Sequence, residues 1–177
     1  MNHPVINTSR LIIRPFLISD AEQLFHLNAS EQVMKYLPKD EVYDREEQAK
    51  QFLKAYLDKS VGTDFVRQVV LRRSDGCWLG WCGLARQENG EVDLGFRFHE
   101  RAWGKGYATE SGLAWLKYGF RERGLDEIIA RAAKGNIGSQ RALEKLGLRR
   151  EAEKDHTQAG FRWLRYKLNR DMFLEEK

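Results

Sequence analysis

Cysteine is scarce in this chain, with two among 177 residues, and no long apolar run is present. Cys77 and Cys82 fall in one strand-like stretch, where their odd separation places them on opposite faces of a sheet. We therefore expect neither a disulfide between them nor a shared metal. The four histidines show no metal-ligand spacing, so we expect no bound metal. Without a signal peptide or a membrane-spanning run, a cytoplasmic protein with no membrane attachment is predicted.

The chain also has little excess of either positive or negative charge. The chain has 30 Lys and Arg against 26 Asp and Glu, a net charge of +4 that is spread along the sequence. This balance suits an anionic small ligand and gives no argument for direct binding of nucleic acid. A length of 177 residues and 42% hydrophobic residues fit one globular domain, residues 1–177, with a single core.

Apolar periodicity predicts a mixed α/β fold, in which helices flank one largely antiparallel central sheet. Strands are expected at residues 10–16, 65–73, 77–86, 92–98, 126–133, 148–154 and 161–169. Helices are expected from a capping box at residues 19–22, after Ser30, from a cap at Asp44, over 107–122 and over 139–146. Residues 155–160 are predicted to form a turn.

The most informative stretch, residues 101–110 (RAWGKGYATE), joins the predicted strand 92–98 to the predicted helix 107–122. Gly104 and Gly106 permit a tight turn and leave room for a ligand to approach the backbone. The free N–H groups of the helix N-terminus, with Arg101 and Lys105, would attract an anion. A phosphate or pyrophosphate cradle is therefore predicted, with a plain strand-to-helix turn as the alternative. The stretch lacks a Gly-Lys-Ser/Thr ending and a third glycine, which excludes a P-loop and a dinucleotide fingerprint.

A second polar pair follows the predicted strand 126–133. Asn136 can satisfy free backbone groups at the strand end, and Ser139 can cap or open the short helix that follows. For either residue alone, a structural role is the simpler interpretation. The pair becomes informative because it follows the glycine turn along the same chain.

Taken together, these stretches resemble the GNAT superfamily of acetyl-coenzyme A-dependent N-acetyltransferases. Arg101-x-x-Gly104-x-Gly106 is similar to the superfamily's pyrophosphate loop. Residues 103–110 are similar to the version in the Rim-type branch, which acetylates N-termini of ribosomal proteins. Asn136-x-x-Ser139 followed by residues 144–147 (EKLG), the opening residues 8–15 (TSRLIIRP) and residues 79–84 (LGWCGL) also match. The resemblance covers about residues 8–170 in the expected order.

The resemblance implies a GNAT-like fold in which the strands at 92–98 and 128–133 splay apart and acetyl-CoA (acetyl-coenzyme A) lies in the wedge between them. The pyrophosphate would be held by Arg101 and by the backbones of Gly104, Lys105, Gly106, Tyr107 and Ala108. The pantetheine arm would pair with the backbones of Phe96 and Phe98. The side chains of Asn136 and Ser139 would also contact the cofactor. Ser139 would lie near the sulfur.

The implied reaction is attack of a neutral amine on the acetyl thioester. A protein α-amine has a pKa of about 8 and a lysine about 10.4, so deprotonating the lysine costs about 3 kcal/mol more. Leu143 stands where many members place a tyrosine that protonates the leaving thiolate, which makes Ser139 the nearest replacement. Candidates for the general base are Glu110, His99, Glu151 and Glu153.

We therefore predict an N-acetyltransferase that uses acetyl-CoA and acts on a primary amine, with a protein or peptide α-amine as the first choice. A small-molecule amine is the alternative acceptor. The alternative from another functional class is a non-catalytic sensor of acyl-CoA. The sequence leaves open whether the protein forms a homodimer.

Overall fold

One nine-stranded sheet organises residues 3–176, which are the residues that the computed structural model describes. Its strands are β1 (Ile6–Asn7), β2 (Leu11–Arg14), β3 (Arg67–Arg72), β4 (Trp78–Arg86), β5 (Val92–Phe98), β6 (Glu127–Ala133), β7 (Arg149–Arg150), β8 (His156–Gln158) and β9 (Phe161–Asn169). Their order is β1-β2-β3-β4-β5-β6-β9-β7, with β8 paired to β9. Neighbours are antiparallel except β5 and β6, so the predicted largely antiparallel sheet is confirmed.

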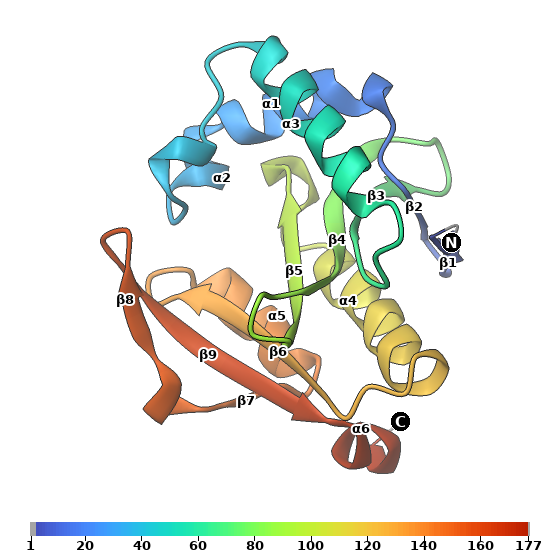
Figure 1. Ribbon diagram of the computed structural model, residues 1–177, viewed down its shortest axis with the longest axis vertical. Coiled ribbons are helices and arrows are strands. Elements are labelled where there is room, and N and C mark those ends of the chain that lie inside the picture. The colour runs from blue at the N-terminus through green and yellow to red at the C-terminus, as the bar shows by residue number, and fades with distance from the viewer. Residues whose placement is uncertain (1–2, 177) are drawn as a thin grey trace.

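Helices cover the sheet on both faces (Figure 1). They are α1 (Ala21–Ala29), α2 (Glu31–Met34), α3 (Glu46–Ser60), α4 (Tyr107–Lys117), α5 (Ile137–Lys145) and α6 (Arg170–Glu176). A π-helical turn, Tyr118–Glu122, extends α4. One apolar cluster lies under α4, and a second lies under α1 and α3. None of the helices within residues 3–176 combines the length and the apolar composition that crossing a membrane requires.

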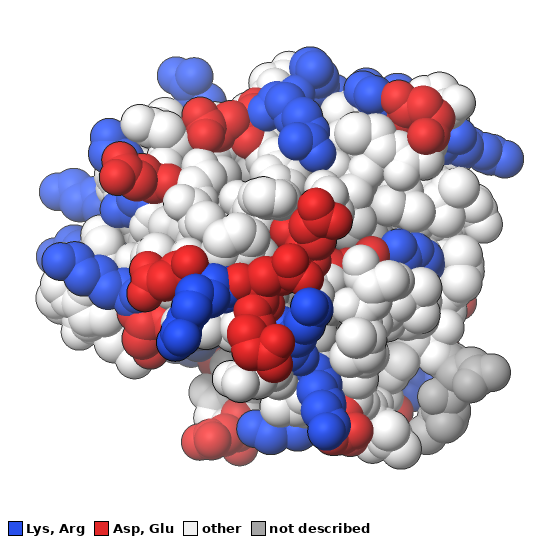
Figure 2. Space-filling model, turned by 90° about the horizontal axis from the view of Figure 1, so that it is seen from above, with Lys and Arg blue, Asp and Glu red and all other residues white. Residues whose placement is uncertain are grey.

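The two core clusters follow from alternation along the strands, since successive side chains point to opposite faces. On β3, Val69 packs beneath α1 and α3 whereas Val70 packs beneath α4. Cys82 lies in the α4 cluster, and both cysteines are free thiols. Acidic and basic side chains are interspersed over the face above α1 and α3, in keeping with the small net charge (Figure 2).

Two predicted helix caps are wrong. At residues 19–22 the carboxylate of Asp20 accepts the N–H of Leu17 at 2.7 Å, and a 3-10 turn, Ile18–Asp20, precedes α1. Asp44 likewise does not cap α3. Its own N–H donates to Oε1 of Gln48 at 2.7 Å. In both places a side chain reaches backwards to the backbone before the helix, which composition alone does not distinguish from a forward cap.

The predicted strand at 148–154 and turn at 155–160 are also wrong. Within the predicted strand, only the two residues of β7 pair with β9, and a 3-10 turn, Ala152–Lys154, follows them. The predicted turn at 155–160 instead contains the strand β8. The reason is Asp155, whose carboxylate accepts the backbone N–H of Arg165 at 3.1 Å and binds Arg150 at 2.6 Å. A side chain therefore replaces the strand partner at that point of β9. Helix α6, which buries Phe173, was not predicted.

The feature that shapes the molecule is the parallel pair β5 and β6. Their register holds at a single point, Asp93 opposite Ile129, near the start of both strands. Beyond that point the two strands separate, and Figure 1 shows them diverging towards α2 and β8. The splayed pair that the sequence implied at residues 92–98 and 128–133 is therefore present in the fold.

Ion pairs fasten the closed end of this wedge. Arg165 of β9, whose side chain is only 6% exposed, binds Glu91 at 2.6 Å and Glu151 at 2.7 Å. Arg131 of β6 also contacts Glu91, at 3.2 Å. Hydrogen bonds from Arg165 are the main reason that the pKa of Glu91 falls to about 2. The turn before β5 is thereby tied to β6 and β9, and we call Glu91, Arg131, Glu151 and Arg165 the clasp.

The clasp predicts a pH-dependent stability. Because the pKa of Glu91 lies below its ordinary value of 4.5, its contribution is present above pH 4.5 and is lost as the pH falls towards 2. We expect Glu91→Gln to lower the free energy of unfolding by about 2 kcal/mol at pH 7, since two arginines lose a charged partner. The difference from wild type should shrink below pH 4. Urea unfolding at pH 7 and pH 3.5 measures it, and an effect no larger than that of Glu88→Gln, an exposed residue of the same turn, would contradict it.

Candidate functional site

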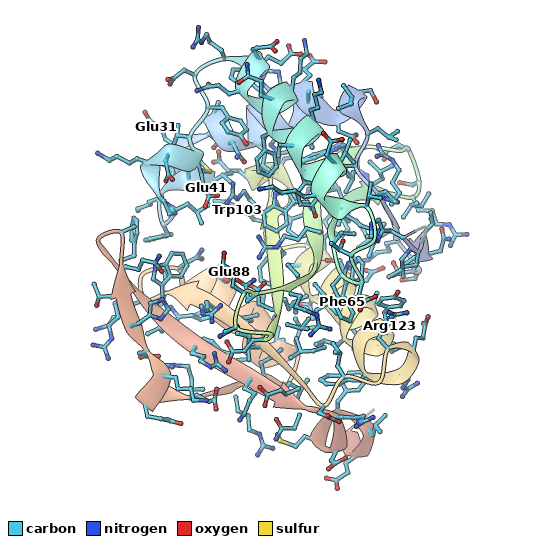
Figure 3. The ribbon with its side chains drawn as sticks, viewed as in Figure 1. Glu31, Glu41, Phe65, Glu88, Trp103 and Arg123 are labelled. Carbon is cyan, nitrogen blue, oxygen red and sulfur yellow. The ribbon has the colours of Figure 1, made fainter. Side chains whose placement is uncertain are left out.

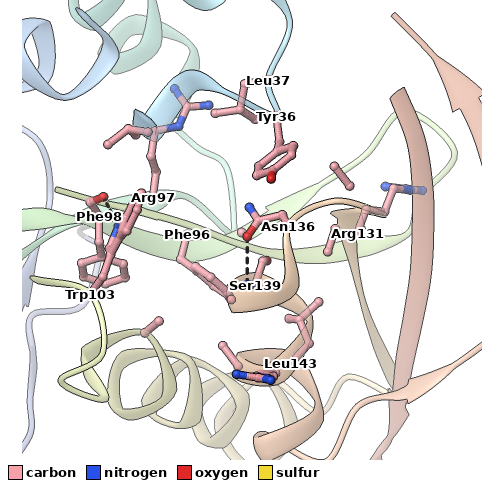
Figure 4. Close-up of a pocket in the computed structure, with 18 of the residues that line it drawn as sticks. Tyr36, Leu37, Phe96, Arg97, Phe98, Trp103, Arg131, Asn136, Ser139 and Leu143 are labelled. Carbon is pink, nitrogen blue, oxygen red and sulfur yellow. Dashed lines mark hydrogen bonds between the residues drawn. The ribbon is translucent and has the colours of Figure 1, made fainter. Parts of the chain in front are cut away.

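A cavity of about 920 Å³ lies where β5 and β6 diverge. Its walls are the ends of these two strands, the loop before α4, the first turns of α5, and parts of α2 and β8. Figure 4 shows Phe96, Asn136 and Ser139 around its centre, with Tyr36 above and Leu143 below. The volume falls in the range of pockets that bind small molecules and cofactors.

The predicted glycine turn forms one wall of this cavity. Gly104 and Gly106 have φ values of +72° and +79°, in the left-handed region that favours glycine. Gly106 also precedes α4 without any side-chain cap, so the first N–H groups of the helix keep their donors free. Gly104, Gly106, Tyr107 and Ala108 line the cavity, whereas the side chain of Lys105 is exposed outside it. The site offers the backbone donors that an anion such as pyrophosphate requires.

The N-terminal segment braces this turn from outside the cavity. Arg10 donates to the carbonyl of Lys105 at 3.0 Å and to Glu110 at 2.6 Å, and its guanidinium lies 4.9 Å from the centre of the Tyr107 ring. Thr8 donates to the same carboxylate at 2.5 Å. Contacts between segments about 100 residues apart in sequence therefore hold the loop in place.

Glu110 does not line the cavity. Burial alone would raise its pKa, but hydrogen bonds from Thr8 and Arg10 outweigh that effect and lower it. A carboxylate with a lowered pKa and several donors around it is a poor proton acceptor. In this geometry Glu110 braces the loop, and its role as a general base stays a prediction.

His99 and Arg101 also lie outside the cavity lining. Burial, and then the charge of Arg101, lower the pKa of His99 to about 4, so the imidazole is neutral at pH 7. The ring packs edge-on against Trp78, and its Nε2 has no hydrogen-bond partner among the described residues. Arg101 donates to the carbonyl of Trp78 at 3.0 Å rather than facing the glycine turn. Neither side chain reaches the place where β5 and β6 separate.

The two other carboxylates considered as bases are equally remote. Glu151 belongs to the clasp and also binds Lys167 at 2.9 Å, while Glu153 lies exposed in the 3-10 turn after β7. Neither lines the cavity. None of the four sequence-predicted bases therefore lines the cavity.

The free edge of β5 does face the cavity. The N–H of His99 donates to Leu79 of β4 at 3.0 Å, and in an antiparallel pair the backbone groups of successive residues point alternately to the two sides. Phe98 and Phe96 therefore direct their N–H and C=O groups towards the wedge. The carbonyl of Phe98 already accepts a hydrogen bond from the Trp103 indole at 2.8 Å. The remaining groups are available to a bound chain that runs between the strands.

Asn136 and Ser139 meet at the opposite wall. The side-chain oxygen of Asn136 accepts the N–H of Ser139 at 3.1 Å, so Asn136, and not Ser139, caps α5. Both residues line the cavity, as does Leu143. Tyr36 reaches across from the turn after α2 and lies over Gly135, where a Cβ atom would come within 2.6 Å of its ring. This contact closes the cavity from above.

Sequence reasoning missed the side chains on the far side of the cavity. They include Arg67, Trp81, Asp93 and Arg97, all of which line it. Asp93 and Arg97 occupy the positions of the predicted strand 92–98 that alternate with its apolar residues. Charged residues on that face were a signal that it borders a site. Arg67 gave no comparable signal, because its contacts depend on the pairing of β3, β4 and β5.

Known proteins share this fold and part of this sequence. The family described as "Acetyltransferase (GNAT) domain" matches residues 10–149. The uncharacterized N-acetyltransferase YnaD of Bacillus subtilis is 33% identical over 147 residues, which cover 82% of this chain and 83% of YnaD. The crystal structure of a GNAT-family acetyltransferase from Bacillus anthracis superposes with a TM-score of 0.80 at 29% identity, covering 95% of this chain and 99% of that one.

A similar fold is found at lower identity. A proposed ribosomal-protein-serine acetyltransferase of Vibrio cholerae has a TM-score of 0.81 at 20% identity, and the match covers 96% of this chain and 99% of that one. At this identity the likeness concerns the fold alone. The fold predicted from the sequence is thus confirmed by both the strand order and the solved structures.

The bracing contacts of Glu110 yield a prediction that separates bracing from proton transfer. We expect Glu110→Gln to weaken binding of acetyl-CoA, the ligand that the resemblance implies, by about fivefold, because the loop loses its ion pair with Arg10. The pH dependence of any turnover should stay unchanged. Isothermal calorimetry gives the affinity, with Glu122→Gln, an exposed residue at the other end of the α4 region, as control. A selective loss of the acidic limb of the pH profile, where activity falls as a base becomes protonated, would show that Glu110 acts as the base.

Proposed function

Because this chain belongs to the GNAT family of acetyltransferases, we propose that it transfers acetyl from acetyl-CoA to a primary amine, with a protein or peptide α-amine as preferred acceptor. The observation that carries this proposal is the single-point pairing of β5 and β6 beside an uncapped helix N-terminus. The glycine turn and the open edge of β5 therefore border the same cavity. A cytoplasmic location stays a prediction, and whether the protein forms a homodimer stays open.

In this proposal the backbone N–H groups from Gly104 to Ala108 hold the pyrophosphate, and the edge of β5 at Phe96 and Phe98 pairs with the pantetheine arm. Asn136, while it caps α5, presents its amide to the same arm. Arg101 supports the loop through its bond to Trp78. Each of these groups is a backbone or neutral donor except Arg101, so the binding of the cofactor arm should depend little on pH.

The acetyl thioester supplies the electrophilic carbon, and the protein supplies donors around it. A free N–H of β5 would stabilise the oxygen charge that develops during attack. The hydroxyl of Ser139 is the proposed proton donor to the departing sulfur, because Leu143 at the neighbouring wall has no proton to give. Both roles follow from the side on which these groups face the cavity.

Few groups in the cavity are placed to take the proton from the amine. Among the described residues that line it, they are the carboxylates of Glu41 and Asp93, each already held by an arginine, and the imidazole of His156 on β8. An acceptor that loses its proton readily, such as an α-amine, therefore suits the site better than a lysine side chain. The Rim-type form of residues 103–110 points to the same acceptor.

The cradle can be tested directly. We expect Gly106→Val to weaken acetyl-CoA binding at least tenfold, because valine resists a φ of +79° and its side chain would lie beside the anion. Gly62→Val is the matched control, since Gly62 has φ +78° in an open surface loop outside the cavity. Calorimetry on both variants, after circular dichroism confirms that they fold, makes the comparison. Equal affinities would overturn the proposed cradle.

A competition assay tests the acceptor. We expect short peptides with free N-termini to be acetylated at least tenfold faster at pH 7.5 than N-terminally blocked peptides that contain lysine, in line with the difference of about 3 kcal/mol in deprotonation. Mass spectrometry of the mixed reaction measures the ratio. Faster modification of the lysine peptides would refute the α-amine preference. Tight binding of acetyl-CoA with no turnover on any amine would favour the acyl-CoA sensor.

A further inference from the structure

Arg67 takes an unusual path across the sheet. It belongs to β3, yet its guanidinium lies over β5, where a Cβ atom on Gly95 would come within 2.9 Å of it. Gly83 of β4, directly between them in the register, also has no side chain to block the way. The guanidinium ends beside Asp93 and lines the cavity. Arg67 therefore lies over Gly95 of β5, and the backbone of the next residue, Phe96, borders the wedge.

A second guanidinium lies close by. The guanidinium carbons of Arg67 and Arg97 lie 5.1 Å and 5.3 Å from the centre of the same indole ring, that of Trp81. Arg97 is held by Asn28 at 2.9 Å and Glu41 at 2.6 Å. Burial lowers the pKa of Arg97, and the charge of Arg67 acts in the same direction. Two like charges are thus held together at one wall of the cavity.

Arg67 is the less satisfied of the two. Its Nε is buried without a hydrogen-bond partner among the described residues. Its Nη2 contacts both oxygens of Asp93 at 3.2 Å, longer than the 2.7–2.9 Å typical of a charged hydrogen bond. Asp93 is shared, since Gln87 donates to it at 2.6 Å. The guanidinium keeps donors and charge that no protein group fully uses.

Cationic side chains outnumber carboxylates around the cavity. The carboxylates that line it are those of Glu41 and Asp93, whereas the cationic residues that line it are Lys35, Arg67, Arg97, Arg131, Arg141 and Lys145. Even with Arg131 set aside because it pairs with Glu91 of the clasp, an excess of positive charge borders the cavity. Such a site favours an anionic group on the ligand and disfavours further positive charge.

We propose that the acceptor amine carries a carboxylate close to it, and that Arg67 binds this carboxylate over Gly95. The inference rests on the proposed acetyltransferase function and narrows its substrate class. A planar guanidinium matches a carboxylate with two parallel hydrogen bonds, which a single amide or hydroxyl cannot reproduce. The carboxylate comes either from an acidic side chain near a peptide N-terminus or from the terminal carboxylate of a very short peptide. Polyamines are poor acceptors, because their remaining ammonium groups meet the arginines.

The test uses matched peptides whose reacting amine is the same. One pair has Glu or Gln as the second residue of a tripeptide amide, and another is a dipeptide with a free or an amidated C-terminus. Spermidine is the polycationic comparison. For wild type we expect kcat/KM to be about tenfold higher for the carboxylate member of at least one pair, as one charged hydrogen-bond pair provides. The pair that shows the preference tells which source of carboxylate the site takes.

Variants assign the preference to Arg67. Arg67→Gln should abolish it while leaving the affinity for acetyl-CoA unchanged, and Arg67→Lys should restore part of it by charge alone. Arg123→Gln is the matched control, because Arg123 also binds one carboxylate, that of Asp64, and lies over an aromatic ring, that of Phe65. Figure 3 shows Arg123 beside Phe65, away from Glu41 at the cavity. The control should keep the full preference.

The outcomes separate this inference from the function on which it rests. Acetylation without a carboxylate preference, a preference that survives Arg67→Gln, or spermidine as the best acceptor would overturn the inference and leave the acetyltransferase standing. If no amine were acetylated, the proposed function would fail. Calorimetric binding of the acetylated Glu and Gln peptides in the presence of coenzyme A would then still decide whether Arg67 binds a carboxylate, with equal affinities counting against it.

Discussion

The structure depends on a parallel strand pair that stops pairing almost as soon as it begins. β5 and β6 are in register only at Asp93 and Ile129, and from there each strand has an edge without its neighbour. Unpaired backbone N–H and C=O groups in a partly buried place are costly unless a ligand or water satisfies them. The clasp around Glu91 holds the strands together at one end and so lets them stay apart at the other. The open end is the cavity.

Two walls of the cavity lie at the carboxyl ends of these two strands, which is where open α/β sheets bind ligands. The glycine turn follows β5, and the Asn136 cap follows β6. The turn is set by local chemistry, since glycine accepts the required φ values, and is then fixed by Arg10 and Glu110. The conformational freedom of the two glycines and the contacts from the N-terminal segment together give a preformed site for an anionic group.

The sequence predicted those parts whose signals are local. Strands β5 and β9 were predicted with their observed bounds, because apolar alternation is unbroken along β5 and both strands end at clear turns. The turn at Gly104 and Gly106 was also predicted from a local signal, because glycine adopts backbone conformations that other residues resist. The contacts that sequence reasoning missed depend on partners far along the chain. The contact between Glu110 and Arg10 joins segments 100 residues apart, and the contact between Arg67 and Asp93 spans three strands.

If the proposed function is right, the open edge of β5 and the glycine turn bind the cofactor as one surface. Hydrogen–deuterium exchange with and without acetyl-CoA can show this, since exchange reports the protection of individual backbone segments. We expect slower exchange in two stretches together, residues 94–98 and 104–109, while β1 and β2 stay unchanged. Protection confined to β8 and β9, or none in either stretch at saturating acetyl-CoA, would contradict it.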